Sequence, residues 1–271
     1  MKHLFILLFP FITHGSYASP NCEAYKLYGE MSKYEACKRA EESFKYYQFT
    51  REYQEILDDA LEIDSTYAYA YQAKGYAYLK SGDFLTWEKL MGKAVELEPA
   101  SYLGYRGWCR YQFFRDYKGA IEDIERLESL VNGDIGFGQN GDYHLKIALA
   151  LCYKALGNKT KAIEIIESQL AKEDHFIGLY DYLHLGILYL ETNQFEKAME
   201  AFEFQEKENT LAENEFYWAL TWKEKGDYEK YSQHLEKSLS LYEKGRHMFD
   251  PYTHQMDRIF LSDIEAERNN D

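Results

Sequence analysis

The chain has 271 residues, of which 46% are hydrophobic, 46 are acidic, 31 are basic and four are cysteine. The apolar content is sufficient for a folded core, which excludes general disorder, and four cysteines are too few for a disulfide scaffold. A net charge of −15 without any run of lysine or arginine excludes broad binding to nucleic-acid phosphates. We therefore expect a folded, acidic protein whose partner is not a nucleic acid.

The first 18 residues have the pattern of a cleaved secretion signal. Lys2 and His3 form a basic start, residues 4–12 are apolar, and Ser16 and Ala18 are small residues at the positions that a signal peptidase requires. The apolar stretch is too short to cross about 30 Å of hydrocarbon. We predict cleavage after Ala18, a secreted or periplasmic protein, and a mature chain of 30 basic and 46 acidic side chains with a net charge of −16.

The segment that follows, residues 19–33, contains Cys22, which lies fifteen positions before Cys37. Residues 19–21 do not resemble the small apolar sequence that precedes a lipid-anchored bacterial cysteine. In an oxidising compartment, Cys22 and Cys37 are a candidate disulfide that would attach this segment to the first helix, although the sequence leaves open whether the bond forms. Cys109 and Cys152 fall in separate amphipathic stretches, where a buried apolar role is expected.

A short phrase recurs along the chain between stretches of helical apolar periodicity. Its middle residues, at positions 83, 116, 158, 194 and 227, are separated by 33, 42, 36 and 33 residues. Three of these four intervals are close to the period of about 34 residues that is typical of a helix-turn-helix repeat. The phrase occurs as Gly82-Asp83-Phe84, Arg115-Asp116-Tyr117, Gly157-Asn158-Lys159, Asn193-Gln194-Phe195 and Gly226-Asp227-Tyr228.

Small and large residues within each unit follow the same pattern. Gly186 before the turn and Ala198 after it would let two helices approach closely, while Tyr189 and Phe202 fill the space beside them. At these residues the chain resembles the tetratricopeptide repeat (TPR) family. The resemblance implies an all-α fold, a right-handed superhelix (α-solenoid) of about six TPR-like helix-turn-helix pairs.

The predicted organisation follows from this repeat. The TPR-like array covers residues 34–245 and includes a glycine-rich insertion at residues 129–142, which stretches one interval to 42 residues. After Gly245, residues 246–271 are expected to form a capping helix and an acidic tail, with the helix beginning at Asp250-Pro251. A membrane-surface role for this helix is disfavoured because acidic residues share its polar face.

No pattern in the sequence indicates catalysis. Residues 136–141 spell the dinucleotide-binding fingerprint G-x-G-x-x-G, but they follow a helical pattern and not the buried strand that this fingerprint needs. The histidines and cysteines lack metal-ligand spacing, and neither a serine nor a cysteine nucleophile motif occurs. We expect no enzyme activity, no cofactor and no metal.

In arrays of the TPR family, the first helix of each pair lines the concave groove. The resemblance therefore implies an exported scaffold or adaptor that binds a protein or an extended peptide, of basic or apolar character because the chain is acidic. An exported carbohydrate- or small-ligand-binding protein that uses the same aromatic residues is the alternative. Each groove position could also pack between neighbouring units. The candidate partner-binding residues are Tyr69, Gln72, Tyr76, Tyr105, Trp108, Tyr180, His184, Phe216 and Tyr217.

Overall fold

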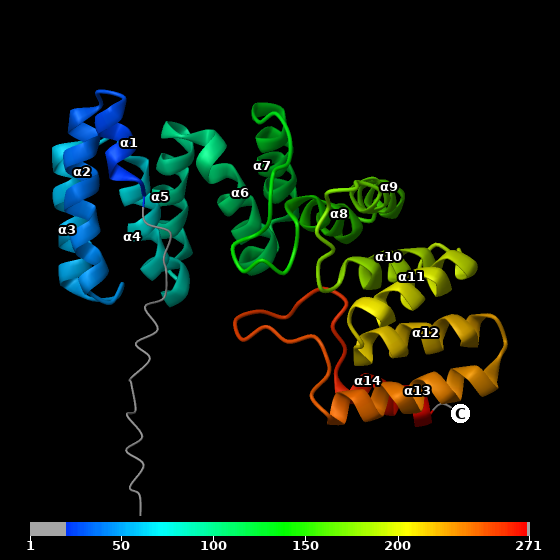
Figure 1. Cartoon of the computed structure of the whole chain (residues 1–271). Helices are drawn as coiled ribbons and strands as arrows, with labels where there is room; N and C mark the ends of the chain where they lie inside the picture. The colour runs from blue at the N-terminus through cyan, green and yellow to red at the C-terminus, as the bar shows by residue number, and fades with distance from the viewer. Residues whose placement is uncertain (1–19, 270–271) are drawn as a thin grey trace, which may run out of the picture. The chain divides into compact units, whose positions relative to one another are not determined.

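The computed structural model describes residues 20–269 (Figure 1). The predicted secretion signal, residues 1–18, lies outside this range. The described residues form α-helices joined by turns and loops, with one isolated bridge between Phe137 and His144 and no strand. The predicted fold class, an all-α solenoid of paired helices, is confirmed. The described residues divide into two compact units, residues 20–98 and 99–269.

The first unit contains two of the predicted helical pairs and a short helix before them. Its core gathers small and large side chains from neighbouring helices, among them Ala36, Leu57, Tyr67 and Ala73. A 3-10 turn at Glu42–Lys45 precedes the connection within the first pair. The helices are α1 (Cys22–Leu27), α2 (Met31–Glu41), α3 (Arg51–Ile63), α4 (Ala68–Ser81) and α5 (Phe84–Leu97).

The second unit contains the remaining four pairs and the C-terminal helix. A π-helical turn at Arg110–Phe114 extends the end of its first helix. The helices are α6 (Pro99–Cys109), α7 (Tyr117–Leu130), α8 (Leu145–Ala155), α9 (Lys159–Leu170), α10 (Asp181–Leu190), α11 (Phe195–Glu208), α12 (Ala212–Glu224), α13 (Tyr228–Glu243) and α14 (Leu261–Asn269).

The recurring turn phrases end one helix and begin the next. Gly82 adopts a φ of 83°, in the left-handed region that ends an α-helix, and the Asp83 carboxylate accepts a hydrogen bond from the backbone N–H of Thr86 in the next helix. The same side-chain cap is formed at the start of α7, α9 and α13, by Asp116, Asn158 and Asp227.

Close approach of paired helices depends on glycine. A Cβ atom built on Gly186 of α10 would lie 2.5 Å from the Phe202 ring of α11. Only hydrogen fits there, and the buried Phe202 ring covers the glycine backbone. The sequence pattern predicts Ala198 opposite Gly186 and Phe202 beside them, whereas in the structure the Phe202 ring itself packs on Gly186.

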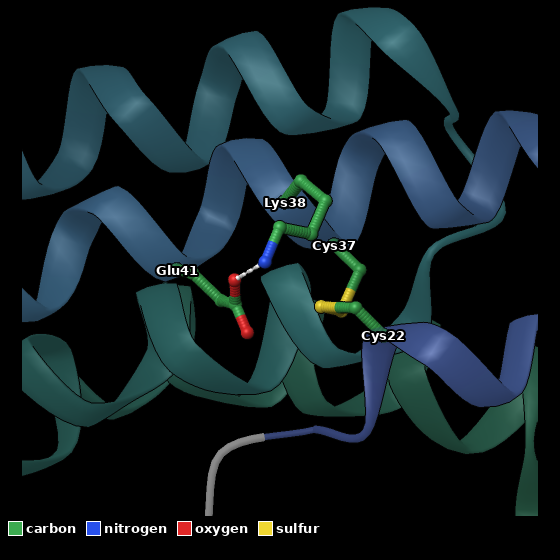
Figure 2. Close-up of a disulfide and its surroundings, with 4 residues drawn as sticks. All are labelled: Cys22, Cys37, Lys38 and Glu41. Carbon is green, nitrogen blue, oxygen red and sulfur yellow. Dashed lines mark hydrogen bonds and ion pairs between the residues drawn. A yellow bond between two sulfur atoms is a disulfide. The ribbon is translucent and has the colours of Figure 1, made fainter. Parts of the chain in front are cut away.

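A disulfide joins Cys22 of α1 to Cys37 of α2, with a Cα–Cα distance of 5.5 Å (Figure 2). Both cysteines are buried in the core of the first unit, and Lys38, the next residue, pairs with Glu41 at the surface. The bond fixes α1 onto the first helical pair.

The C-terminal segment differs from the prediction. The helix does not begin at Asp250-Pro251. Instead, the Asp250 carboxylate accepts the backbone N–H groups of Tyr252 and Thr253, at 2.7 and 2.8 Å, and forms a turn. Residues 246–260 contain no helix, and α14 begins only at Leu261. An aspartate before proline favours a turn as well as a helix start. Here Gln112, which lies 138 positions earlier in the chain, donates to Asp250 and favours the turn. We call residues 246–260 the strap.

Candidate functional site

The strap runs along the first helices of the pairs in the second unit. Figure 1 shows it as the long orange-to-red loop that leaves α13 and returns to α14. Its polar partners come from the π-helical turn after α6, from α8, from α10 and from α12. The predicted groove positions of the unit lie on α6, on α12, and within or directly before α10. The inner surface, defined as the surface of the π-helical turn after α6 and of α8, α10 and α12 that contacts the strap, is therefore covered by the chain itself.

The start of the strap is anchored on α12. The backbone N–H of Met248 lies 3.0 Å from both carboxylate oxygens of Glu213, and the N–H of Ala212 donates to the carbonyl of Arg246 at 2.8 Å. Met248 and Glu213 are fully buried. Burial raises the pKa of Glu213, and the N–H of Met248 offsets part of this shift.

The middle of the strap contacts the connection between α6 and α7 in the second unit. The Gln112 side chain, which is buried, donates from Nε2 to Thr253 Oγ1 at 2.7 Å and to Asp250 Oδ2 at 3.3 Å. The Arg115 guanidinium donates to the carbonyl of His254. These contacts join residues about 140 positions apart in the sequence.

The end of the strap inserts Asp257 between α8 and α10. Lys154 Nζ donates to Asp257 Oδ1 at 2.6 Å, and His184 Nδ1 lies 2.7 Å from Asp257 Oδ2. The side chains of Lys154 and Asp257 are each 8% exposed and that of His184 is fully buried. Burial raises the pKa of Asp257, but the Lys154 charge and the His184 hydrogen bond outweigh it and hold this pKa at about 2. Asp257 is thus an ionised carboxylate in a nearly closed site.

An aromatic cluster lies behind this ion pair. Tyr143 packs against Trp108, Tyr180 and the His184 ring, with centroid distances of 5.9, 5.8 and 5.5 Å. The glycine-rich insertion packs on the same cluster, because a Cβ on Gly138 would lie 2.5 Å from the Trp108 ring. The insertion is therefore a part of the folded unit that supports the inner surface.

A second cluster, buried except for Asp134, lies between the insertion and the loop before α10. His144 Nε2 is 2.7 Å from Asp134 Oδ1, His175 Nε2 is 3.0 Å from Asp181 Oδ2, and the two histidine rings meet edge to face at 5.6 Å. Burial lowers the pKa of His144, while the Asp134 carboxylate opposes this shift. His144 is thus held in its neutral form to a lower pH than an exposed histidine.

The predicted groove residues fall into two sets. Trp108, Tyr180, His184 and Phe216 are buried in the second unit, where Tyr105 and Tyr217 are half-buried. Tyr69, Gln72 and Tyr76 are half-buried on α4 of the first unit. Of the nine, His184 contacts the strap through a short hydrogen bond, and Tyr180 and Trp108 belong to the aromatic cluster behind it.

Sequence reasoning missed Lys154, Glu213, Gln112 and Asp257. Lys154 follows the buried stretch Ile147–Cys152, so a lysine at the end of this helix was a signal of an unusual environment. Nothing in the local pattern links it to an aspartate 103 positions later.

The first unit has a separate open pocket of about 450 Å³ on α2, α3 and the connection between them. Tyr47 and Phe49, in the same connection, are 67% and 46% exposed. An acidic lining beside exposed aromatic rings suits a basic or apolar partner group. The pocket is lined by Arg39, Glu42, Tyr46, Glu52, Glu55, Ile56, Asp58 and Asp59.

Among residues 20–269, no helix combines the length and the apolar character that a membrane crossing needs. Nor does the range contain a cluster of three or more histidine, cysteine or acidic side chains placed to hold a metal ion. Burial raises the pKa of both free thiols, Cys109 and Cys152, so these cysteines are protonated and unreactive at neutral pH.

Comparison with known proteins identifies the repeats. The tetratricopeptide repeat family model matches residues 68–101, 143–170 and 182–203, which correspond to three of the six helical pairs. No curated protein matches the sequence.

Several solved structures share the fold. PilF of Pseudomonas aeruginosa is 16% identical, with 87% of this chain and 99% of that chain covered and a TM-score of 0.59. PilW, a widely conserved type IV pilus biogenesis factor, is 13% identical over 80% of this chain and 94% of that chain, with a TM-score of 0.57. YrrB, a TPR protein with an unusual peptide-binding site, is 17% identical over 69% of this chain and 93% of that chain, with a TM-score of 0.54.

Proposed function

We propose that the protein is an exported, non-catalytic TPR scaffold that binds a segment of another protein. The observation that carries this proposal is the series of TPR-like pairs whose first helices place aromatic side chains at inner positions. Tyrosine and tryptophan bury a large area with few rotatable bonds to freeze, which favours recognition surfaces.

In the first unit, the proposed contacts are Tyr69, Gln72 and Tyr76, which lie at intervals of three and four residues along α4 and so share one face. All three are half-buried, so part of each side chain is accessible. The acidic pocket on α2 and α3 supports a partner of basic or apolar character.

Export is the second element of the proposal. Its support is the leader-like pattern of residues 1–18 together with the Cys22–Cys37 disulfide, because such bonds persist in oxidising compartments. Mass spectrometry of the protein from its native cells is expected to find a chain that begins at Ser19. An intact N-terminus in a cytosolic fraction would contradict export.

Binding is tested by panning a random peptide library on the full chain. We expect basic or apolar peptides that bind the wild type, and a loss of affinity of at least tenfold in the variant Tyr69→Ala, Gln72→Ala, Tyr76→Ala. Tyr78→Ala, a half-buried tyrosine about 200° around α4 from Tyr76, is the matched control. Recovery of no peptide, or equal binding by the triple variant and the control, would contradict the proposed surface.

A further inference from the structure

The strap makes the contacts that a bound peptide would make. It lies on the inner surface without helix or strand, a backbone N–H bonds to Glu213, and a carboxylate bonds to Lys154 and His184. We propose that the inner surface of the second unit binds an extended segment of a partner protein that carries an aspartate or glutamate, and that the strap occupies this site until such a segment displaces it. The inference rests on the proposed scaffold function.

The requirement for a carboxylate follows from the charges beneath the strap. Lys154 is 8% exposed, and among residues 20–269 its second carboxylate contact is Glu191 at 3.2 Å, which also pairs with Lys159 at 3.1 Å. A buried ammonium group that loses a short ion-pair contact is strongly disfavoured. An occupant that replaces the strap must therefore bring its own carboxylate to the position of Asp257.

The strap also has features of an occupant that can leave. Asp257 has a φ of 65°, in the left-handed region that non-glycine residues rarely adopt. Phe249 and Tyr252 are 62% and 76% exposed, so much of the apolar surface of the strap stays in water. The helix beyond it is attached independently, since Ile264 is buried against α12 and α13 and Tyr231 donates to Glu267. The strap can thus open as a loop between two fixed ends.

The middle and the end of the strap face cationic groups, although the chain as a whole is acidic. The net charge of −15 favours a basic partner. The Glu213 carboxylate faces only the start of the strap, whereas the Arg115 guanidinium and the Lys154 ammonium face its middle and its end, where the His184 imidazole lies beside Asp257. An acidic segment fits this surface, whereas the acidic pocket of the first unit suits a basic group.

The test uses the full chain with Asp257→Asn, which removes the strap's carboxylate, and two fluorescent peptides. One peptide has the sequence of residues 246–260, and the other differs only by asparagine at position 257. We expect the first peptide to bind the Asp257→Asn chain at least tenfold more tightly than the wild type, and the asparagine peptide to lose at least tenfold. Asp174→Asn, which removes an exposed carboxylate of the same unit, is the matched control and should behave as the wild type.

Hydrogen exchange of residues 246–260 shows independently whether the strap has opened. Each of three results would overturn the proposal. These are an opened strap that binds no peptide, equal binding of the two peptides, and unchanged hydrogen exchange of residues 246–260 in Asp257→Asn. If Asp257→Asn lowers the helical circular dichroism, Gln112→Ala is used in its place, because this change loosens the strap and leaves Lys154 and Asp257 intact. The Gln112→Ala chain is then expected to bind the first peptide at least threefold more tightly than the wild type. Binding no tighter than that of the wild type would overturn the proposal. These readouts lie in the second unit, so they do not depend on the Tyr69, Gln72 and Tyr76 test.

Discussion

Lys154 and Asp257 form a nearly buried ion pair with an Nζ–Oδ1 distance of 2.6 Å, although 103 residues separate them. Lys154 belongs to α8, in the middle of the repeat array, and Asp257 belongs to the strap that follows the last pair. The pair therefore closes the second unit on itself, and it makes the C-terminal segment a structural part of the inner surface.

Removing the ammonium should cost stability. In Lys154→Met, Asp257 loses the charge that keeps it ionised in a buried site, and breaking such a pair typically costs about 3 kcal/mol or more. Urea unfolding followed by circular dichroism measures the change. Lys159→Met is the control, because Lys159 is 40% exposed and also pairs with Glu191. It should lose less than about 1 kcal/mol. Equal losses in the two variants would contradict the role of Lys154.

Acid should destabilise the protein through Asp257. Its pKa falls from 3.8 to about 2 on folding, so its contribution is fully present above pH 3.8 and is lost as the pH falls toward 2. A shift of this size corresponds to about 2 kcal/mol at neutral pH. Glu213 has the opposite effect on stability. Its pKa is raised on folding, so it lowers the free energy of unfolding as the pH rises above its ordinary pKa of 4.5. Unfolding free energies measured between pH 2 and 5 should fall less steeply in Asp257→Asn; an identical slope would refute this assignment.

His144 should add a second pH dependence at higher pH. Its pKa in the folded protein is below 6.5, so the unfolded chain binds the proton first and stability falls as the pH drops below 6.5. His144→Asn removes this proton uptake, and its stability should change less between pH 6.5 and 5 than that of the wild type. Parallel curves for the two proteins would show that His144 does not titrate differently on folding.

The two glycines Gly186 and Gly92 should respond to alanine with opposite signs. In Gly186→Ala the new methyl would lie 2.5 Å from the Phe202 ring, and overpacking of this kind costs about 1–3 kcal/mol. Gly92, inside α5, has no atom within 4 Å of a built Cβ, so alanine should stabilise α5 by about 0.5–1 kcal/mol. Thermal unfolding of the two single variants measures both effects, and a stabilising Gly186→Ala would contradict the packing of α10 on α11.

The disulfide should stabilise the first unit. A closed loop of about 15 residues restricts the unfolded chain by about 3 kcal/mol. The variant Cys22→Ser, Cys37→Ser should lose stability of this order in urea unfolding, and reductant should destabilise the wild type to the same extent without affecting the variant. Insensitivity of the wild type to reductant would show that the bond contributes nothing.

Short-range patterns were sufficient to predict the helical pairs but not the strap. The turn at Gly82-Asp83 determines its own geometry, and the close approach of α10 and α11 at Gly186 lies within one repeat, so both could be predicted from spacing, although the residue that packs on Gly186 is Phe202 and not Ala198. The contact of Lys154 with Asp257 depends on the folded path of the whole unit. Asp250 shows the limit of prediction from local sequence, because its context suits a helix start and a turn equally well. The choice depends in part on Gln112, which is far away in the chain and donates to Asp250.

The strap is docked on the inner surface, and the backbone amide of Met248 reports on this docking most directly. Hydrogen exchange of this amide in the wild-type chain should be strongly slowed, because Met248 is fully buried and its N–H donates to Glu213. Protection comparable to that of the α12 amides is the expected result. Exchange at the rate of an unstructured peptide would show that the strap is not docked and would contradict the account.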